Sequence, residues 1–217
     1  MTPDLFRSAT GLSASLAEKW APIYTLAMAG YGIDTPLRQA SFLAQAGHES
    51  AGFTAARESF NYSVAGLQAT FGKRLSSMQC AALGRQPGES SVPLARQIQI
   101  ANIVYGGRMG NVSANDGWRY RGGGHIQITG RDNYADAATD TGLDLSDNPD
   151  LIADPTACAV TACWYWQSNG CNTMADRYEF TRISKLINVG NPDSTVTPNG
   201  NAERLARWKA ARAALGV

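Results

Sequence analysis

The stretch from Gly106 to Gly124 limits the possible folds more than any other part of the chain. It is rich in Gly, Asn and Asp, so it cannot form regular helix throughout. On both sides of it, apolar residues recur at the spacing of α-helices. We therefore predict a mainly α protein that is interrupted by one irregular, glycine-rich segment.

The predicted helices follow from apolar spacing and from start signals. Thr35-Pro36 combines a capping side chain with proline at the first helical position, and that helix should end between Gly47 and Gly52. Ser15 and Glu18 match a capping box. The remaining helices are expected within residues 1–33, 64–71, 75–83, 94–105, 132–141, 156–166, 180–187 and 202–215, with a turn-rich linker at 145–155.

Length and charge exclude several classes of protein. The 217 residues, 44% of them hydrophobic, can bury the core of one domain, with a large lobe at about 1–65 and 116–217 and a small lobe at about 66–115. A net charge of +1 argues against a nucleic-acid partner. The longest uncharged run, Trp20–Ile33, is shorter than the about 20 apolar residues that span a bilayer, and it lacks the features of a signal peptide. We expect no stable membrane insertion and a monomer.

The cysteines and histidines do not predict a metal site. Cys80, Cys158, Cys163 and Cys171 lack the paired spacing of zinc ligands, so reduced, buried thiols are expected. A disulfide within the group 158, 163 and 171 remains open. Neither His48 nor His125 has a third ligand at suitable spacing, so both are expected to form hydrogen bonds beside a cleft. We expect no metal and no cofactor.

Two glutamates nine residues apart, Glu49 and Glu58, are candidates for acid/base chemistry. Glu49 falls in the last turn of its helix, where the helix dipole and apolar neighbours should raise its pKa. Glu58 follows in a polar segment beside Arg57, where solvent and a cation should keep it ionised. A proton donor and an ionised base are the two groups of an inverting glycosidase. The alternative is that both are solvated surface carboxylates.

The segment from Trp118 to Gly130 has the composition of a carbohydrate groove. Glycines allow close approach of the backbone to a ligand, and aromatic rings offer faces on which sugars stack. A phosphate-binding loop is disfavoured because no Gly-Lys-Ser/Thr follows. Ile126 and Ile128 alternate with polar residues, which predicts a short strand over 125–129.

Taken in order, several of these motifs resemble glycoside hydrolase family 19, and within it the phage endolysins. The resemblance runs from about residue 35 to the C-terminus and implies a lysozyme-like, two-lobed helical fold, with a cleft between the lobes and at most a very small β element. The motifs that carry it are His48-Glu49, Glu58, the segment 120–129, Asn148-Pro149-Asp150-Leu151, Trp164-Tyr165-Trp166 and Ile187-Asn188.

Roles follow from the resemblance position by position. It implies that Glu49 is the general acid, that Glu58 is the general base, and that Thr129 helps to hold the attacking water. An inverting mechanism without metal is implied, with carboxyl groups about 6.5–9.5 Å apart. The implied substrate-binding or supporting residues are His48, Tyr62, Tyr120, Gln127, Asn133, Asn188 and Arg204. The family's Asn-Gly-Gly reads Asn188-Val189-Gly190 here, which removes one flexible position from a groove loop.

The implied activity is that of an endolysin, a lysozyme-type muramidase that hydrolyses the β-1,4 bonds of bacterial peptidoglycan. Such an enzyme would be made in the host cytoplasm without a signal peptide, would act on the cell wall, and would need a helper protein to permeabilise the inner membrane. The alternatives are a chitinase and a wall-binding module without catalysis. The basic residues of the last helix, Arg204, Arg207, Lys209 and Arg212, are expected on a solvated face, or else against an anionic envelope or substrate.

Overall fold

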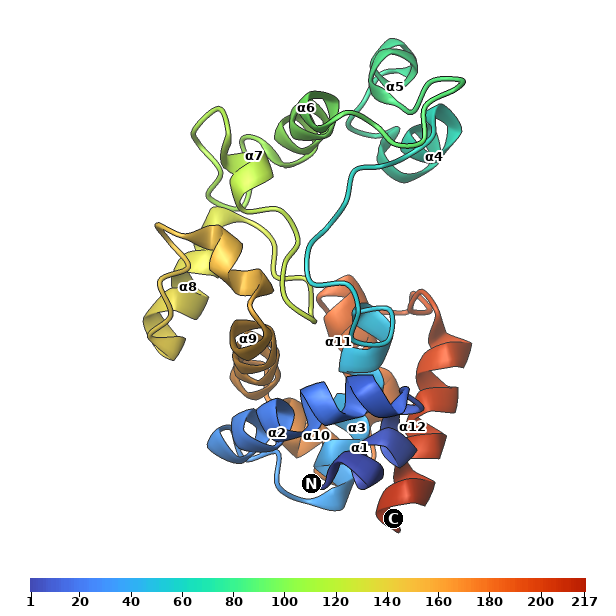
Figure 1. Cartoon of the computed structure of the whole chain (residues 1–217), viewed down its shortest axis with the longest axis vertical. Coiled ribbons are helices and arrows are strands. Elements are labelled where there is room, and N and C mark those ends of the chain that lie inside the picture. Colours follow the sequence, from blue (N-terminus) through green and yellow to red (C-terminus); the bar gives the residue numbers. More distant parts are fainter.

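The computed structural model describes all 217 residues and contains twelve α-helices, one 3-10 helix and no β-sheet (Figure 1). The predicted mainly α fold is confirmed. None of the helices combines the length and the apolar character needed to cross a bilayer. In chain order the helices are α1 (Pro3–Thr10), α2 (Ala14–Gly30), α3 (Pro36–Glu49), α4 (Val64–Phe71), α5 (Ser77–Leu83), α6 (Leu94–Tyr105), α7 (Asp116–Arg119), α8 (Arg131–Thr141), η1 (Pro149–Ala153), α9 (Pro155–Ser168), α10 (Cys171–Asp176), α11 (Phe180–Val189) and α12 (Asn201–Leu215).

The strongest local signals gave the most accurate helix boundaries. Helix α3 begins as predicted, with the Thr35 hydroxyl accepting from the Arg38 amide and Pro36 in the first turn. Helices α4 and α6 have the predicted bounds. The predicted capping box at Ser15 is wrong, because Ser13 caps α2 and left-handed Gly11 ends α1 before it.

Three other local predictions need correction. The segment 125–129 is not a strand: Gly123 and Ile128 form one antiparallel bridge around a tight turn. The turn requires left-handed backbone at Gly124 and Gln127, which a simple alternation of apolar and polar residues does not reveal. The expected linker at 145–155 contains the 3-10 helix η1, and the short helices α7 and α10 were not predicted.

The larger of two hydrophobic clusters has 31 buried residues and is built mainly from α1, α2, α3 and α8–α12. Helix α12 packs along α3 and α1, and α2 packs against α9. Trp166 of α9 meets Phe42 of α3 edge-on, with ring centroids 5.4 Å apart. Trp164 and Trp166 are both buried. All four cysteines are buried and unpaired.

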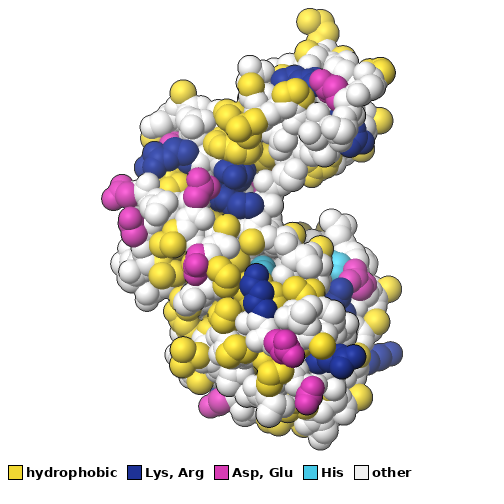
Figure 2. All heavy atoms as spheres, in the orientation of Figure 1, with side chains coloured by type: hydrophobic (Ala, Val, Ile, Leu, Met, Phe, Trp, Pro, Cys, Tyr) yellow, Lys and Arg dark blue, Asp and Glu magenta, His cyan; other side chains and the backbone are white.

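The smaller cluster has nine buried residues, from Phe60 to Val104, and includes side chains of α4, α5 and α6. Tyr62 and Val64 also pack against it. Its members therefore begin before residue 66, and the lobe boundaries given above stay a prediction. In the space-filling view a deep hollow opens between the part that carries α4–α6 and the part that carries α11 and α12 (Figure 2).

Candidate active site

Glu49 stands at the C-terminal end of α3, where the chain turns sharply toward the smaller cluster. The Ser50 hydroxyl donates to the Ala46 carbonyl at 2.6 Å and accepts from the Phe53 amide at 2.8 Å. Ala51 and Phe53 both have left-handed backbone. These contacts end the helix where the sequence predicted and leave the Glu49 side chain 19% exposed.

The main partner of Glu49 is the guanidinium of Arg204, from the first turn of α12, which forms an ion pair with Oε1. The Arg204 side chain is 1% exposed, and its other nitrogens donate to Gln45 Oε1 and, at 3.0 Å, to the Asn199 carbonyl. No protein group bonds to Glu49 Oε2. The expected helix dipole and apolar neighbours of Glu49 did not include this cation, and the solvated face expected for Arg204 is wrong.

His48 lies beside this ion pair and belongs to a second group of charges. Its Nδ1 is 3.0 Å from the Glu203 carboxylate, and Glu203 also accepts from Arg207 Nε at 2.8 Å. Glu203 and Arg207 thus form an i,i+4 ion pair on α12. The pKa of Glu203 is lowered, first by the hydrogen bond from Arg207. A Cβ at Gly200 would collide with the His48 imidazole, so glycine lets the loop before α12 pack onto this ring.

Glu58 lies on the extended segment between α3 and α4, and neutral donors hold its carboxylate. The Tyr105 hydroxyl donates to Oε1 at 2.9 Å, and the Gly122 amide donates to Oε2 at 3.0 Å. A Cβ at Gly122 would lie 2.7 Å from the Gln127 side-chain oxygen and 3.2 Å from Glu58. Burial raises the pKa of Glu58 more than these bonds and the nearby cations lower it. The expected solvated, ordinary base is thus corrected to a half-buried carboxylate.

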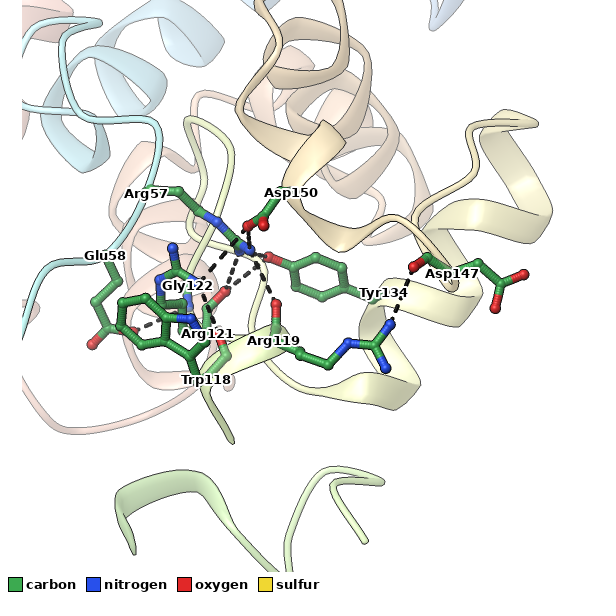
Figure 3. Close-up of polar contacts among 9 residues, drawn as sticks. All are labelled: Arg57, Glu58, Trp118, Arg119, Arg121, Gly122, Tyr134, Asp147 and Asp150. Carbon is green, nitrogen blue, oxygen red and sulfur yellow. Dashed lines mark hydrogen bonds and ion pairs between the residues drawn. The ribbon is translucent and has the colours of Figure 1, made fainter. Parts of the chain in front are cut away.

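Arg57 does not pair with Glu58, although it precedes it in the chain. Its guanidinium forms an ion pair with Asp150 and donates at 3.0 Å to the carbonyls of Arg119 and Arg121 (Figure 3). The hydrogen bond from Arg57 lowers the pKa of Asp150. The Arg121 guanidinium lies 3.7 Å from the centre of the Trp118 ring. These contacts fix the glycine-rich segment against the Glu58 segment.

The turn 122–129 and the start of α8 bring three predicted residues to one hollow of about 440 Å³. Gln127, Thr129 and Asn133 line it together with Tyr165 and the rims of α9 and α11. The Thr129 hydroxyl donates to the Gln127 carbonyl at 2.9 Å, which leaves its oxygen able to accept. The Tyr165 pKa is raised to about 12, first by burial and also by the nearby negative charge of Glu49. Glu49 thus acts electrostatically on Tyr165, although it is not among the residues that line the hollow.

The remaining candidates have different positions. The pKa of Tyr62 is raised by burial and by Glu58, so this phenol lies near the second glutamate. Asn188 accepts from the Asn199 amide at 2.9 Å and thus holds the loop before α12. Tyr120 is buried and donates to the Ser146 carbonyl at 2.8 Å, which contradicts its predicted place in the groove.

The predicted position of His125 beside a cleft is also wrong. His125 is fully buried in the larger cluster, not beside a cleft, and its Nδ1 is 2.6 Å from the Tyr24 hydroxyl. Burial lowers the pKa of His125 to about 4. No group of three His, Cys, Asp or Glu side chains is arranged to hold a metal ion.

Sequence reasoning assigned no role to three residues that shape this site, Tyr105, Arg121 and Asp150, and it expected Arg57 to act on Glu58 and not to pair with Asp150. Asp150 stands in the Asn148-Pro149-Asp150-Leu151 motif, which was a usable signal. Tyr105 is the last residue of an otherwise ordinary amphipathic helix and gave no signal. Chemically, the site offers one carboxylate with a free oxygen beside a buried cation, and a second carboxylate held by two donors.

Several known proteins are similar to this chain in sequence. A family model described as chitinase class I matches residues 95–175, which include the turn 122–129 but neither Glu49 nor Glu58. A glycosyl hydrolase family 19 domain-containing protein of Haemophilus influenzae is 38% identical over 162 residues, which are 73% of this chain and 74% of that protein. Acidic endochitinase Q of Nicotiana tabacum is 49% identical over 51 residues, which are 23% of this chain and 20% of that protein.

The fold is also similar to that of solved structures. The crystal structure of chitinase C from Streptomyces griseus matches 99% of this chain and 76% of its own chain, with a TM-score of 0.61 and 20% identity. A bacterial family 19 chitinase matches with a TM-score of 0.59 and 19% identity, over 99% of this chain and 94% of that chain. At these identities the likeness concerns the fold.

Proposed function

The chain belongs to glycoside hydrolase family 19, and we propose that it hydrolyses the β-1,4 glycosidic bonds of bacterial peptidoglycan by an inverting acid/base mechanism. The observation that supports this most directly is that two carboxylates are held by different kinds of donor. Glu58 accepts from Tyr105 and from Gly122 of the turn, and Glu49 pairs with the buried Arg204.

In the proposed reaction, Glu49 gives its proton to the glycosidic oxygen as the bond from that oxygen to the sugar C1 breaks. Oε2 of Glu49 is the oxygen without a protein partner, so it is the one that carries this proton. Arg204 remains on Oε1 and stabilises the carboxylate that forms. Glu49 thus needs a cation that stays in place while its own charge changes.

Glu58 takes the proton from the water that attacks C1 on the opposite face, so the configuration at C1 is inverted. The Tyr105 and Gly122 donors orient its carboxylate. Because the Thr129 hydroxyl donates to the Gln127 carbonyl, its oxygen can accept a hydrogen of the same water. We assign sugar contacts to Gln127 and Asn133, which line the hollow.

The preference for peptidoglycan rests on the resemblance of the ordered motifs to phage endolysins. In that role the chain acts as a monomer on the glycan strands of the cell wall, and a separate membrane-permeabilising protein gives it access. A decrease in turbidity of outer-membrane-permeabilised bacteria is the expected result. Unchanged turbidity at an enzyme concentration that degrades purified glycan would contradict the lytic role.

Chitin is the second candidate substrate, because the named relatives and fold neighbours include chitinases. Purified peptidoglycan and chitin oligosaccharides should be assayed side by side, with reducing ends measured for both. We expect faster release from peptidoglycan. Efficient cleavage of chitin alone would replace this proposal by the chitinase, and cleavage of neither would favour a wall-binding module without catalysis.

A further inference from the structure

Tyr105 connects the smaller hydrophobic cluster to the carboxylate of Glu58. It is the last residue of α6, and its ring meets that of Phe60 edge-on, with centroids 6.0 Å apart. Its hydroxyl donates to Glu58 Oε1 at 2.9 Å. The Tyr105 carbonyl accepts from the Asn111 side chain at 2.9 Å, which holds the end of the helix. The hydroxyl is therefore presented by a well-fixed residue.

The second carboxylate oxygen is held from a different part of the chain. The Gly122 amide donates to Oε2 at 3.0 Å, and the Gly122 carbonyl accepts from the Glu58 amide at 2.8 Å. Gly122 belongs to the segment that Arg57 ties to Asp150 near the larger cluster (Figure 3). The two oxygens of Glu58 are thus held by two different parts of the structure: α6 holds one, and the glycine-rich segment holds the other.

The charged and titratable groups that face Glu58 leave Tyr105 a distinct role. Tyr62, Arg121 and Arg57 also act on this carboxylate electrostatically. Neither guanidinium bonds to it, because Arg57 is engaged with Asp150 and Arg121 donates to the Trp118 carbonyl at 2.8 Å. Arg108 acts electrostatically on Tyr105, where it opposes the rise in pKa that burial and Glu58 cause. The Tyr105 hydroxyl is the only side-chain donor bonded to Glu58.

We propose that Tyr105 is a positioning residue for the general base, which it holds in the ionised form and in a fixed orientation by donating to Oε1 of Glu58. This inference rests on the proposed role of Glu58 as the base. A phenol suits the task because it donates without adding charge, and burial beside Glu58 raises the pKa of Tyr105 so that it keeps its proton. The ability of Glu58 to act as a base then depends on the position of α6, because α6 carries the Tyr105 hydroxyl.

The direct test is Tyr105→Phe, which removes only the hydroxyl, with kcat/KM measured against pH on a soluble oligosaccharide that the wild type cleaves. Loss of a donor to the carboxylate should move the acidic limb to higher pH by about one unit. Activity one unit below the wild-type limb should fall by roughly tenfold. An acidic limb at the wild-type position would overturn the proposal, whatever the maximal rate.

Tyr178→Phe is the matched control, because this tyrosine is 56% exposed and its hydroxyl makes no hydrogen bond. Its pH profile should coincide with that of the wild type. Thermal unfolding of Tyr105→Phe should remain a single cooperative transition, which shows that the variant folds.

A second readout does not depend on turnover. The carboxyl carbon of Glu58 can be titrated by NMR in protein labelled with 13C-glutamate, with Glu58→Gln identifying its resonance. A higher pKa in Tyr105→Phe supports the inference, and an unchanged pKa overturns it. Near-normal turnover of Glu58→Gln would instead remove the proposed base, so failure of the proposed function and failure of the inference give different results.

Discussion

Glu49 and Glu58 are nine positions apart in the chain, but their carboxylates are held by different kinds of contact. Glu49 pairs with Arg204, a buried cation that arrives from a helix 155 residues away. Glu58 pairs with no cation and accepts from a phenol and a backbone amide. Burial raises the pKa of Glu58, and its donors only partly offset that effect.

Because the contacts differ, a change in the surroundings of each glutamate should affect a different property of the protein. A buried ion pair is costly to break from one side, because the remaining charge loses its partner in a region of low dielectric. Neutral donors contribute less to folding but control the ionisation of the group they hold. Changes around Glu49 should therefore appear in stability, and changes around Glu58 should appear in pH dependence.

The largest effects are expected from removing each carboxylic acid in turn. Glu49→Gln and Glu58→Gln should each lower kcat by about 10²–10⁴-fold, because neither amide can transfer the required proton. Only Glu49→Gln leaves Arg204 without a counter-charge, so its unfolding midpoint should fall further. Steady-state kinetics and urea denaturation of both variants measure this. Equal loss of stability in the two variants would contradict the claim that only Glu49 stabilises a buried cation.

Two arginines of α12 give the next largest difference. Arg204→Ala should destabilise the fold by about 3–5 kcal/mol, since it leaves Glu49 unpaired and Gln45 without its donor. Arg207→Ala, three positions further, removes a partner of the exposed Glu203 and should cost less than about 1 kcal/mol. Free energies of unfolding from chemical denaturation decide this. Similar decreases in the free energy of unfolding for both variants would show that the buried Arg204 pair stabilises the fold no more than the exposed Arg207 pair.

The pH profile of the wild type tests the other carboxylate. Because the pKa of Glu58 in the fold is raised above 4.5, its ionised form is present above that raised pKa and is lost as the pH falls through it. The acidic limb of the kcat/KM profile should therefore lie above pH 4.5. Below this limb, kcat/KM should fall about tenfold for each pH unit. An acidic limb below pH 4.5 would contradict the raised pKa of the base.

The smallest effect on kcat is expected at Gly122. A Cβ there would press on the Gln127 side chain and on Glu58, and the flexible end of Gln127 can give way. Gly122→Ala should lower kcat by about tenfold and stability by about 1 kcal/mol. Gly30→Ala is the control, since a Cβ at that position meets no atom within 4 Å. Matching losses in the two variants would show that crowding at Glu58 is not the cause.

Local chemistry made much of this fold predictable. Thr35-Pro36 fixed the start of α3, and apolar periodicity gave the bounds of α4 and α6. The short alternation around Ile126 gave a false strand, because left-handed backbone at Gln127 turns the chain within the same residues.

The candidate site was predictable in its residues and much less so in its electrostatics. Glu49 and Glu58 stand out by type, spacing and resemblance. That Arg204 reaches Glu49, while Arg57 turns from Glu58 to Asp150, depends on contacts between distant segments. No local pattern contains such contacts, so the sequence did not predict the partners of either glutamate or the raised pKa of Glu58.

Analysis of the products from purified peptidoglycan tests the central claim most directly. Mass spectrometry identifies the sugar at the new reducing end, and NMR at early times identifies the anomer that is released first. We predict fragments that end in reducing N-acetylmuramic acid, released as the inverted α-anomer by the wild type and absent with Glu49→Gln and Glu58→Gln. Release of the β-anomer, or equal product from either variant, would contradict inverting catalysis by this pair of glutamates.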